Sequence, residues 1–162
     1  MRDPLTGLGN RRFLEEQVQD LFDSCAQAEM DLMCMVIDLD HFKQVNDTLG
    51  HQAGDDILIH ISDVIKSVIR PEDYAVRHGG DEFLIFVPGV NIIRVKEAAD
   101  LISKRFKQYV KSKLPQSLHM AGVSIGIASR FQHRATSYQN LVEFADEQLY
   151  QAKQKGRGLI SC

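Results

Sequence analysis

The sequence predicts an α+β domain with a central, mainly antiparallel sheet surrounded by helices. Short apolar runs bounded by turn residues indicate buried strands, and apolar residues at helical spacing indicate helices between them. The order of these segments contains β-α-β-β-α-β, the split arrangement of ferredoxin-like and palm folds. Many functions share such folds, so the order alone identifies none of them.

The first half of the chain contains two helices separated by a strand. The apolar run from Leu32 to Ile37 is short and continuous, as expected of a buried strand, and it ends at Asp38-Leu39-Asp40. We expect the second helix to end no later than Arg70, because Pro71 disfavours the helical conformation of the residue before it. The apolar positions are Phe13, Leu14, Val18, Leu21, Phe22 and Cys25 in the first helix, and Ile57, Leu58, Ile61, Ile65, Val68 and Ile69 in the second.

The second half begins with a hairpin, in which residues 78–81 form a tight turn between Tyr74–Arg77 and Phe83–Val87. Small residues alternate with apolar ones from Val123 to Ala128, which indicates a strand approached closely by a helix. Leu159-Ile160 is a possible last strand. Two helices complete this half, with Val95, Ala98, Ala99, Ile102, Phe106 and Tyr109 on one, and Leu141, Phe144, Ala145, Leu149 and Ala152 on the other.

Bulk properties fit one domain over residues 1–162 and exclude several classes of protein. The formal charge is −3 and there is no long basic run, so we expect no nucleic-acid polymer as a partner. No apolar run approaches the roughly 18 residues that suggest a membrane span. Three cysteines without metal-like spacing favour a reduced, cytoplasmic setting.

The most informative segment is Arg77-His78-Gly79-Gly80-Asp81-Glu82-Phe83. Its glycines permit close approach of a phosphate or another backbone, and two acidic residues follow them. An ordinary surface turn is the alternative, because Gly-Gly and Asp are common in hairpins.

A second acidic group, Asp38 and Asp40, ends the first strand. Carboxylates there can hold Mg²⁺, which prefers oxygen ligands and usually recruits substrate phosphates. If this strand lies beside the hairpin, Asp38 and Asp81 meet at one rim, as metal-assisted phosphoryl chemistry requires. Asp40 could instead cap the short helix that starts at His41.

Together these segments resemble the GGDEF family of diguanylate cyclases, and the resemblance covers essentially the whole chain. The matching motifs are Asp3–Arg12, Asp38–Asp47, Gly50-His51 with Gly54-Asp55, Gly79–Phe83, Val123–Gly126, and Ala145–Lys153 continuing to Gly156-Arg157. The family usually continues Gly-Arg-Asn, whereas this chain has Gly156-Arg157-Gly158.

The resemblance implies a palm-like fold and a catalytic centre with Mg²⁺, for which Mn²⁺ is a possible substitute. Asp38, the main-chain carbonyl of Leu39, Asp81 and Glu82 are the implied metal ligands. Asp38, Asp81 and Glu82 are the implied catalytic residues, and Glu82 either helps bind metal or assists deprotonation of the attacking 3′-hydroxyl.

The resemblance also implies a GTP site. Asn46 and Asp55 would read the guanine edge, because a carboxylate can accept both N1–H and N2–H of guanine. The alternative for Asp55 is a favourable charge in the first turn of its helix. Phe42, Lys43, Gly79, Gly80, Lys153 and Arg157 would line the substrate, with backbone N–H groups and cations facing the phosphates. Simple solvation is the alternative for the cations.

Arg70 and Asp73 match the family's inhibitory Arg-x-x-Asp site, which binds cyclic di-GMP away from the active centre. Arginine suits phosphate and the Hoogsteen edge of guanine through planar, bidentate donation. The alternative is an arginine that satisfies carbonyls at a helix C-terminus. Arg94 and Arg105 lie nearby in sequence as candidates to complete this site.

The implied reaction condenses two GTP molecules into cyclic di-GMP and two pyrophosphates, in a homodimer of two such domains. The resemblance further implies the C-terminal catalytic part of a longer sensory protein, which missing N-terminal regions could anchor to a membrane. Two alternatives stay open: a catalytically silent cyclic di-GMP receptor, and a cyclase that makes another product from GTP.

Overall fold

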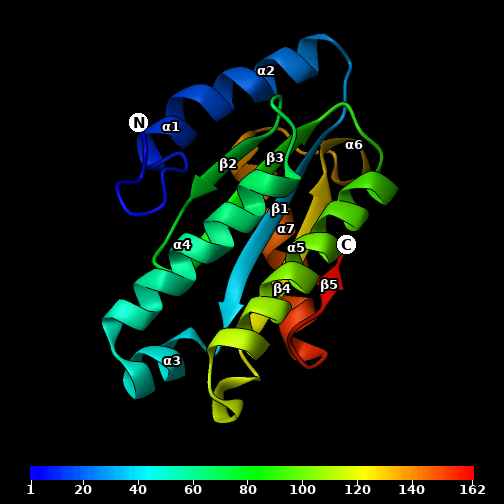
Figure 1. The fold of residues 1–162 in the computed structure, drawn as a ribbon. Coiled ribbons are helices and arrows are strands. Elements are labelled where there is room, and N and C mark those ends of the chain that lie inside the picture. The colour runs from blue at the N-terminus through cyan, green and yellow to red at the C-terminus, as the bar shows by residue number, and fades with distance from the viewer.

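The computed structural model describes all 162 residues and is built on one five-stranded sheet (Figure 1). The strand order is β2-β3-β1-β4-β5. Strand β1 lies at the centre, antiparallel to both β3 and β4, whereas the short β5 pairs parallel with β4. The strands are β1 (Leu32–Asp40), β2 (Tyr74–Arg77), β3 (Glu82–Pro88), β4 (Gly122–Ser129) and β5 (Ile160–Ser161).

Helices cover both faces of the sheet and bury two apolar clusters. Helices α4 and α5 pack on one face, and α7 packs on the other face together with the N-terminal helical segment (Figure 1). The helical elements are α1 (Arg11–Phe13), the π-helix η1 (Leu14–Val18), α2 (Gln19–Gln27), α3 (Phe42–Leu49), α4 (His51–Val68), α5 (Ile92–Lys113), the 3₁₀ helix η2 (Gln116–Leu118), α6 (Arg130–His133) and α7 (Tyr138–Gln154). No helix combines the length and apolar character needed to cross a membrane.

The observed architecture confirms the predicted α+β class and the palm-like strand order. The first predicted helix is one continuous helical segment whose middle is a π-helix, which the apolar spacing did not reveal. The last strand forms one residue later than expected, at Ile160–Ser161. All three cysteines are free thiols.

Alternation along β1 decides which side of the sheet its acidic end faces. Met33, Met35, Ile37 and Leu39 belong to the cluster under α4 and α5, whereas Leu32, Cys34 and Val36 belong to the cluster under α7. Side chains two residues apart share one face of a strand. Asp38 and Asp40 therefore continue the face covered by α7.

Gly126 on β4 allows α7 to approach the sheet this closely. A Cβ atom at this position would lie 2.2 Å from the carbonyl oxygen of Ala145 and 2.3 Å from the backbone nitrogen of Leu149. Backbone atoms in the middle of a helix cannot move aside without shifting the helix. The small residues of the predicted strand are thus explained by the close approach of a helix.

We predict that Gly126→Ala lowers the free energy of unfolding by about 2 kcal/mol or more, because the added methyl group overpacks a rigid contact. Urea denaturation followed by circular dichroism measures the change. Gly122→Ala is the matched control on the same strand, since the nearest atom to its Cβ would be 3.9 Å away. Equal stability of the two variants would contradict this packing account.

Candidate active site

The register of β1 and β3 brings the acidic residues of two motifs together. Asp38 lies directly opposite Glu82, and the backbone N–H of Leu39 donates to the carbonyl of Asp81 at 3.2 Å. The side chain of Asp38 is only 17% exposed. Burial raises the pKa of Asp38, and the nearby charges of Asp81 and Glu82 raise it further, although Lys153 opposes both effects. Asp38, Asp81 and Glu82 therefore form a crowded group of carboxylates at one edge of the sheet, here called the carboxylate rim.

This donor set suits Mg²⁺ that is bound together with a substrate. No three His, Cys, Asp or Glu side chains converge closely enough to form a closed metal cage. Mg²⁺ is usually held by one or two carboxylates, with waters and substrate phosphates completing its shell. Asp38, with Asp81 and Glu82 beside it, provides such an open, oxygen-only arrangement.

Asp146 on α7 is a fourth carboxylate at this rim, and the sequence motifs predict no role for it. Partial burial and the charge of Glu82 raise the pKa of Asp146 to about 6, and Asp38 and Glu143 contribute further repulsion. His78 opposes the shift, and its Nδ1 lies 3.6 Å from Glu82 Oε1. The signal available in the sequence was the Ala145-Asp146 motif, which carries no chemistry until α7 is placed over β1.

Lys153 in the last turn of α7 and Arg157 just beyond this helix lie beside the two aspartates at the end of β1. Lys153 Nζ contacts Asp38 Oδ2 in a hydrogen-bonded ion pair. Arg157 lies in the turn that follows α7, where its φ of 61° is not helical, and its NH1 is 3.8 Å from Asp40 Oδ1. The one-turn helical spacing expected for Lys153 and Arg157 is therefore wrong, because α7 ends at Gln154, yet the two cations still lie beside aspartates two positions apart on β1. That Lys153 and Arg157 bind the triphosphate stays a prediction.

Asp40 anchors the turn that follows α7. Its side chain is 2% exposed and accepts hydrogen bonds from Ser124 Oγ at 2.7 Å and from the backbone N–H of Gly158 at 2.9 Å. The alternative in which Asp40 caps the next helix is wrong, because no side chain caps α3. The capping position is His41, whose φ of 62° places it in the left-handed region.

Arg77 stabilises the Gly79-Gly80 turn by a hydrogen bond from its side chain. Its guanidinium donates to the carbonyl of Gly80 at 2.8 Å and contacts Asp3 Oδ1 at 3.3 Å. Both glycines are exposed and neither has a positive φ. The turn is therefore held by a side chain rather than by special torsions of its glycines, and space above Gly80 stays open.

The two residues expected at the guanine edge lie on adjacent helices. Asn46 is on α3, and its side chain rests on Gly54 of α4, where a Cβ atom would be 1.9 Å from Asn46 Oδ1. Asn46 Oδ1 is buried and has no hydrogen-bond partner. Asp55 follows Gly54 and lies beyond the first turn of α4, so the first-turn alternative is wrong. Phe42 is half-buried and Lys43 is exposed at the start of α3.

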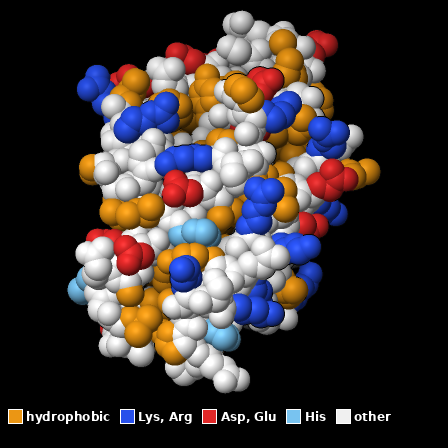
Figure 2. Space-filling model, viewed as in Figure 1, with side chains coloured by type: hydrophobic (Ala, Val, Ile, Leu, Met, Phe, Trp, Pro, Cys, Tyr) orange, Lys and Arg blue, Asp and Glu red, His pale blue; other side chains and the backbone are white.

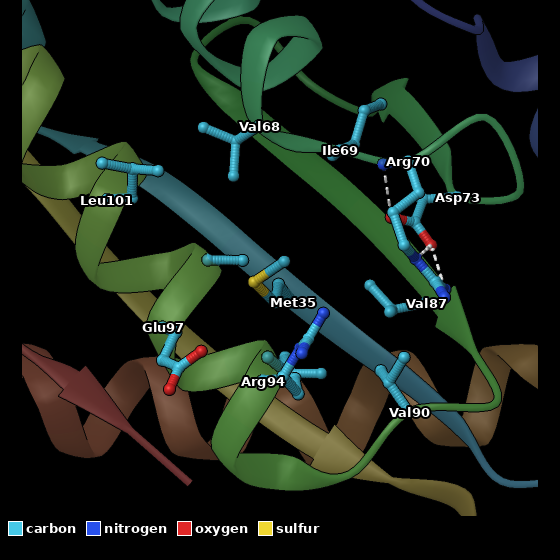
Figure 3. Close-up of a pocket in the computed structure, with 12 residues that line it drawn as sticks. Met35, Val68, Ile69, Arg70, Asp73, Val87, Val90, Arg94, Glu97 and Leu101 are labelled. Atoms are coloured by element: carbon cyan, nitrogen blue, oxygen red, sulfur yellow. Dashed lines mark hydrogen bonds and ion pairs between the residues drawn. The ribbon is translucent and has the colours of Figure 1, made fainter.

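Arg70 and Asp73 line a separate cavity of about 330 Å³ between α4, β3 and α5 (Figure 3). Arg70 NH2 donates to Asp73 Oδ1 at 2.7 Å and to the carbonyl of Pro88 at 2.9 Å. Arg94 rises from α5 into this cavity, over a floor that includes Met35 (Figure 3). Arg105 is directed elsewhere, because it donates to Ser67 Oγ at 2.8 Å. The structure thus separates the two arginines that the sequence left undecided.

The face of the molecule formed by α4 and α5 carries no broad patch of a single charge (Figure 2). On the face covered by α4 and α5, basic and acidic side chains are interspersed with apolar and uncharged polar ones (Figure 2). This mixture agrees with the formal charge of −3. Local groups, rather than a broad basic surface, have to hold any anionic ligand.

We predict that Asp146→Asn raises the free energy of unfolding at pH 7 in EDTA, by up to about 1 kcal/mol after solvent screening, because the group is only partly buried. The folded-state pKa is raised, so the contribution of Asp146 is intact below about pH 4 and is lost as the pH rises to about 6. Urea denaturation at pH 4, 5, 6 and 7 measures the difference. Asp100→Asn on the exposed side of α5 is the control, and a pH-independent effect of Asp146→Asn would contradict the repulsion.

Comparison with known proteins places this geometry in a family. A family model described as "Diguanylate cyclase, GGDEF domain" matches residues 1–159. Diguanylate cyclase DgcS of Shewanella oneidensis is 38% identical over 97% of this chain and 51% of its own length. Diguanylate cyclase DosC of Escherichia coli is 34% identical over 98% of this chain and 34% of its own length. The chain thus spans about half or less of these curated relatives.

Two solved structures share the fold along almost their whole length. The GGDEF domain of DgcB from Caulobacter crescentus, in complex with c-di-GMP, has a TM-score of 0.86 and 30% identity, covering 99% of this chain and 94% of that one. The active GGEEF domain of a diguanylate cyclase from Vibrio cholerae has a TM-score of 0.85 and 28% identity, covering 95% and 96%. Sequence, fold and the carboxylate rim agree: this chain belongs to the GGDEF family of diguanylate cyclases.

Proposed function

We propose that this domain condenses two GTP molecules into cyclic di-GMP and two pyrophosphates, with Mg²⁺ or Mn²⁺ at the carboxylate rim. The observation that carries the proposal is the juxtaposition of Asp38 with Asp81 and Glu82 in a member of this family. A receptor without activity has no need of this costly group of carboxylates, because like charges in a partly buried site destabilise the free protein.

Asp38, the carbonyl of Leu39 and Asp81 hold the metal in this proposal, and Glu82 lies beside them. The metal supplies polarisation of the α-phosphate and stabilises the leaving pyrophosphate. Glu82 either contributes a ligand or accepts the proton of the attacking 3′-hydroxyl. The exposed Gly79-Gly80 turn lets the nucleotide approach the backbone closely.

Asn46 and Asp55 provide selectivity for guanine. The buried Oδ1 of Asn46 has no partner, which costs free energy, so a rotation of this side chain that brings the oxygen to an N–H group of the base would be favourable. The Asp55 carboxylate accepts from N1–H and N2–H, and adenine offers no such pair. Half-buried Phe42 and exposed Lys43 lie where backbone N–H groups at the start of α3 face the phosphates, with Lys153 and Arg157 opposite.

Two domains have to meet for both new bonds to form. Each domain is proposed to hold one GTP, and the 3′-oxygen of each nucleotide attacks the α-phosphorus of the other and releases pyrophosphate. The proposed active state is therefore a homodimer. Its rate should rise more steeply than linearly with protein concentration.

Cyclic di-GMP is proposed to inhibit the enzyme through the cavity of Arg70, Asp73 and Arg94. Two guanidinium groups near one another can donate to phosphate and to the Hoogsteen edge of guanine. The complex of the related DgcB domain with c-di-GMP supports a product-binding role in this family.

We predict that Asp81→Asn reduces cyclic di-GMP formation by at least about 100-fold, because an amide lacks the charge needed at the metal. The measurement is chromatographic product analysis of GTP and Mg²⁺ over a range of protein concentrations. Asp100→Asn is the matched control and should remain active. Product absent from the parent protein at every concentration, with cyclic di-GMP still bound tightly, would favour the receptor alternative.

We predict that Arg70→Ala and Arg94→Ala each weaken cyclic di-GMP binding by at least about tenfold, since each removes a charged donor from the cavity. Arg105→Ala should bind normally, because Arg105 pairs with Ser67 outside this cavity. Isothermal titration calorimetry measures the three affinities. Inhibition of turnover by product should weaken in the same order, and an effect of Arg105→Ala equal to that of Arg94→Ala would contradict this assignment.

A further inference from the structure

The two ion pairs that join β1 to the end of α7 differ in one important respect. Asp40 has two other donors, the hydroxyl of Ser124 and the N–H of Gly158, so it is satisfied without Arg157. Arg157 lies 3.8 Å away with 47% of its side chain exposed, and it is free to turn toward a ligand. The pair between Asp40 and Arg157 is loose.

Asp38 depends on Lys153 alone. The Nζ of Lys153 is the only hydrogen-bond donor to the Asp38 carboxylate, and both side chains are largely buried, at 17% and 28% exposed. Glu82 on β3 and Asp81, which directly precedes that strand, crowd Asp38. The ammonium group therefore provides the local counter-charge of this rim.

The same two groups have other partners in the proposed complex. A divalent cation needs the Asp38 carboxylate, and a triphosphate needs the Lys153 ammonium. A free cation that enters without nucleotide has to displace Lys153 against charge repulsion and leaves it without a partner. A triphosphate that enters without metal has to pull Lys153 away and leaves Asp38 unneutralised among like charges.

We infer that Lys153 is an internal counter-ion. Its ammonium group pairs with Asp38 in the free enzyme and moves to the triphosphate when the metal ion binds Asp38. Metal and nucleotide then bind as one unit, because each releases the partner that the other requires. Such coupling is reciprocal: whatever factor nucleotide adds to metal affinity, metal adds to nucleotide affinity. This inference rests on the proposed function and specifies how its site is filled.

Removing the charge of Lys153 should open Asp38 to a free metal ion. We predict that Lys153→Met binds Mn²⁺ at least about tenfold more tightly than the parent protein when no nucleotide is present. Electron paramagnetic resonance of unbound Mn²⁺ measures the affinity. Lys155→Met is the matched control, since Lys155 is exposed two residues later and removes the same formal charge. The double variant Asp38→Asn with Lys153→Met should bind Mn²⁺ no more tightly than the parent protein.

Lys153→Gln repeats the test with a side chain that keeps a donor for Asp38 and protects against a failure of Lys153→Met to fold. Mn²⁺ affinity of these variants no higher than that of Lys155→Met would overturn the inference, and so would a gain that survives Asp38→Asn. A separate titration with 3′-deoxy-GTP, which cannot be condensed, tests the proposed function itself. With this nucleotide present, the parent protein should bind Mn²⁺ tightly, and Lys153→Met should no longer bind Mn²⁺ more tightly than the parent. If the parent protein binds no Mn²⁺ even then, the proposed metal site is rejected independently of the role of Lys153.

Discussion

The central position of β1 and its fixed register determine the rest of this molecule. Antiparallel pairing with β3 sets Asp38 opposite Glu82, and pairing with β4 sets Asp40 opposite Gly122, two residues before Ser124. A shift by one residue would turn both aspartates toward α4 and α5 and would place apolar side chains under α7. The two buried clusters oppose this shift, because β1 contributes alternate residues to each of them. The apolar core thereby fixes the position of the acidic rim.

Electrostatic strain and its compensation are concentrated at that rim. Four carboxylates gather there, and the pKa values of Asp38 and Asp146 are both raised by burial and by repulsion from neighbouring carboxylates. Lys153 offsets part of this repulsion from α7, which Gly126 allows to lie close to the sheet. A site that is crowded when free and relieved by a bound cation and its nucleotide gains affinity from that relief. Lys153 thus links the packing of α7 against the sheet to the proposed chemistry at Asp38.

Much of this fold could be predicted from the sequence, because apolar periodicity separates helices from strands and Pro71 and the Gly79-Gly80 turn mark boundaries. The convergence of Asp38 with the hairpin was also predicted. Contacts that depend on tertiary placement were not: the role of Asp40 as an anchor for Ser124 and Gly158, and the location of Asp146, require α7 to be placed on the sheet. The choice of Arg94 over Arg105 likewise depends on the direction in which each side chain leaves α5. Their spacing in the sequence carries no such information.

The most direct test of the central claim is a crystal structure with Mn²⁺ and 3′-deoxy-GTP, with the metal located by its anomalous scattering. We expect Mn²⁺ between the Asp38 carboxylate, the Leu39 carbonyl and Asp81, with Lys153 moved from Asp38 to the triphosphate. Metal bound away from these residues would contradict the assignment of the site. Metal bound there while Lys153 still contacts Asp38 would contradict the exchange of partners.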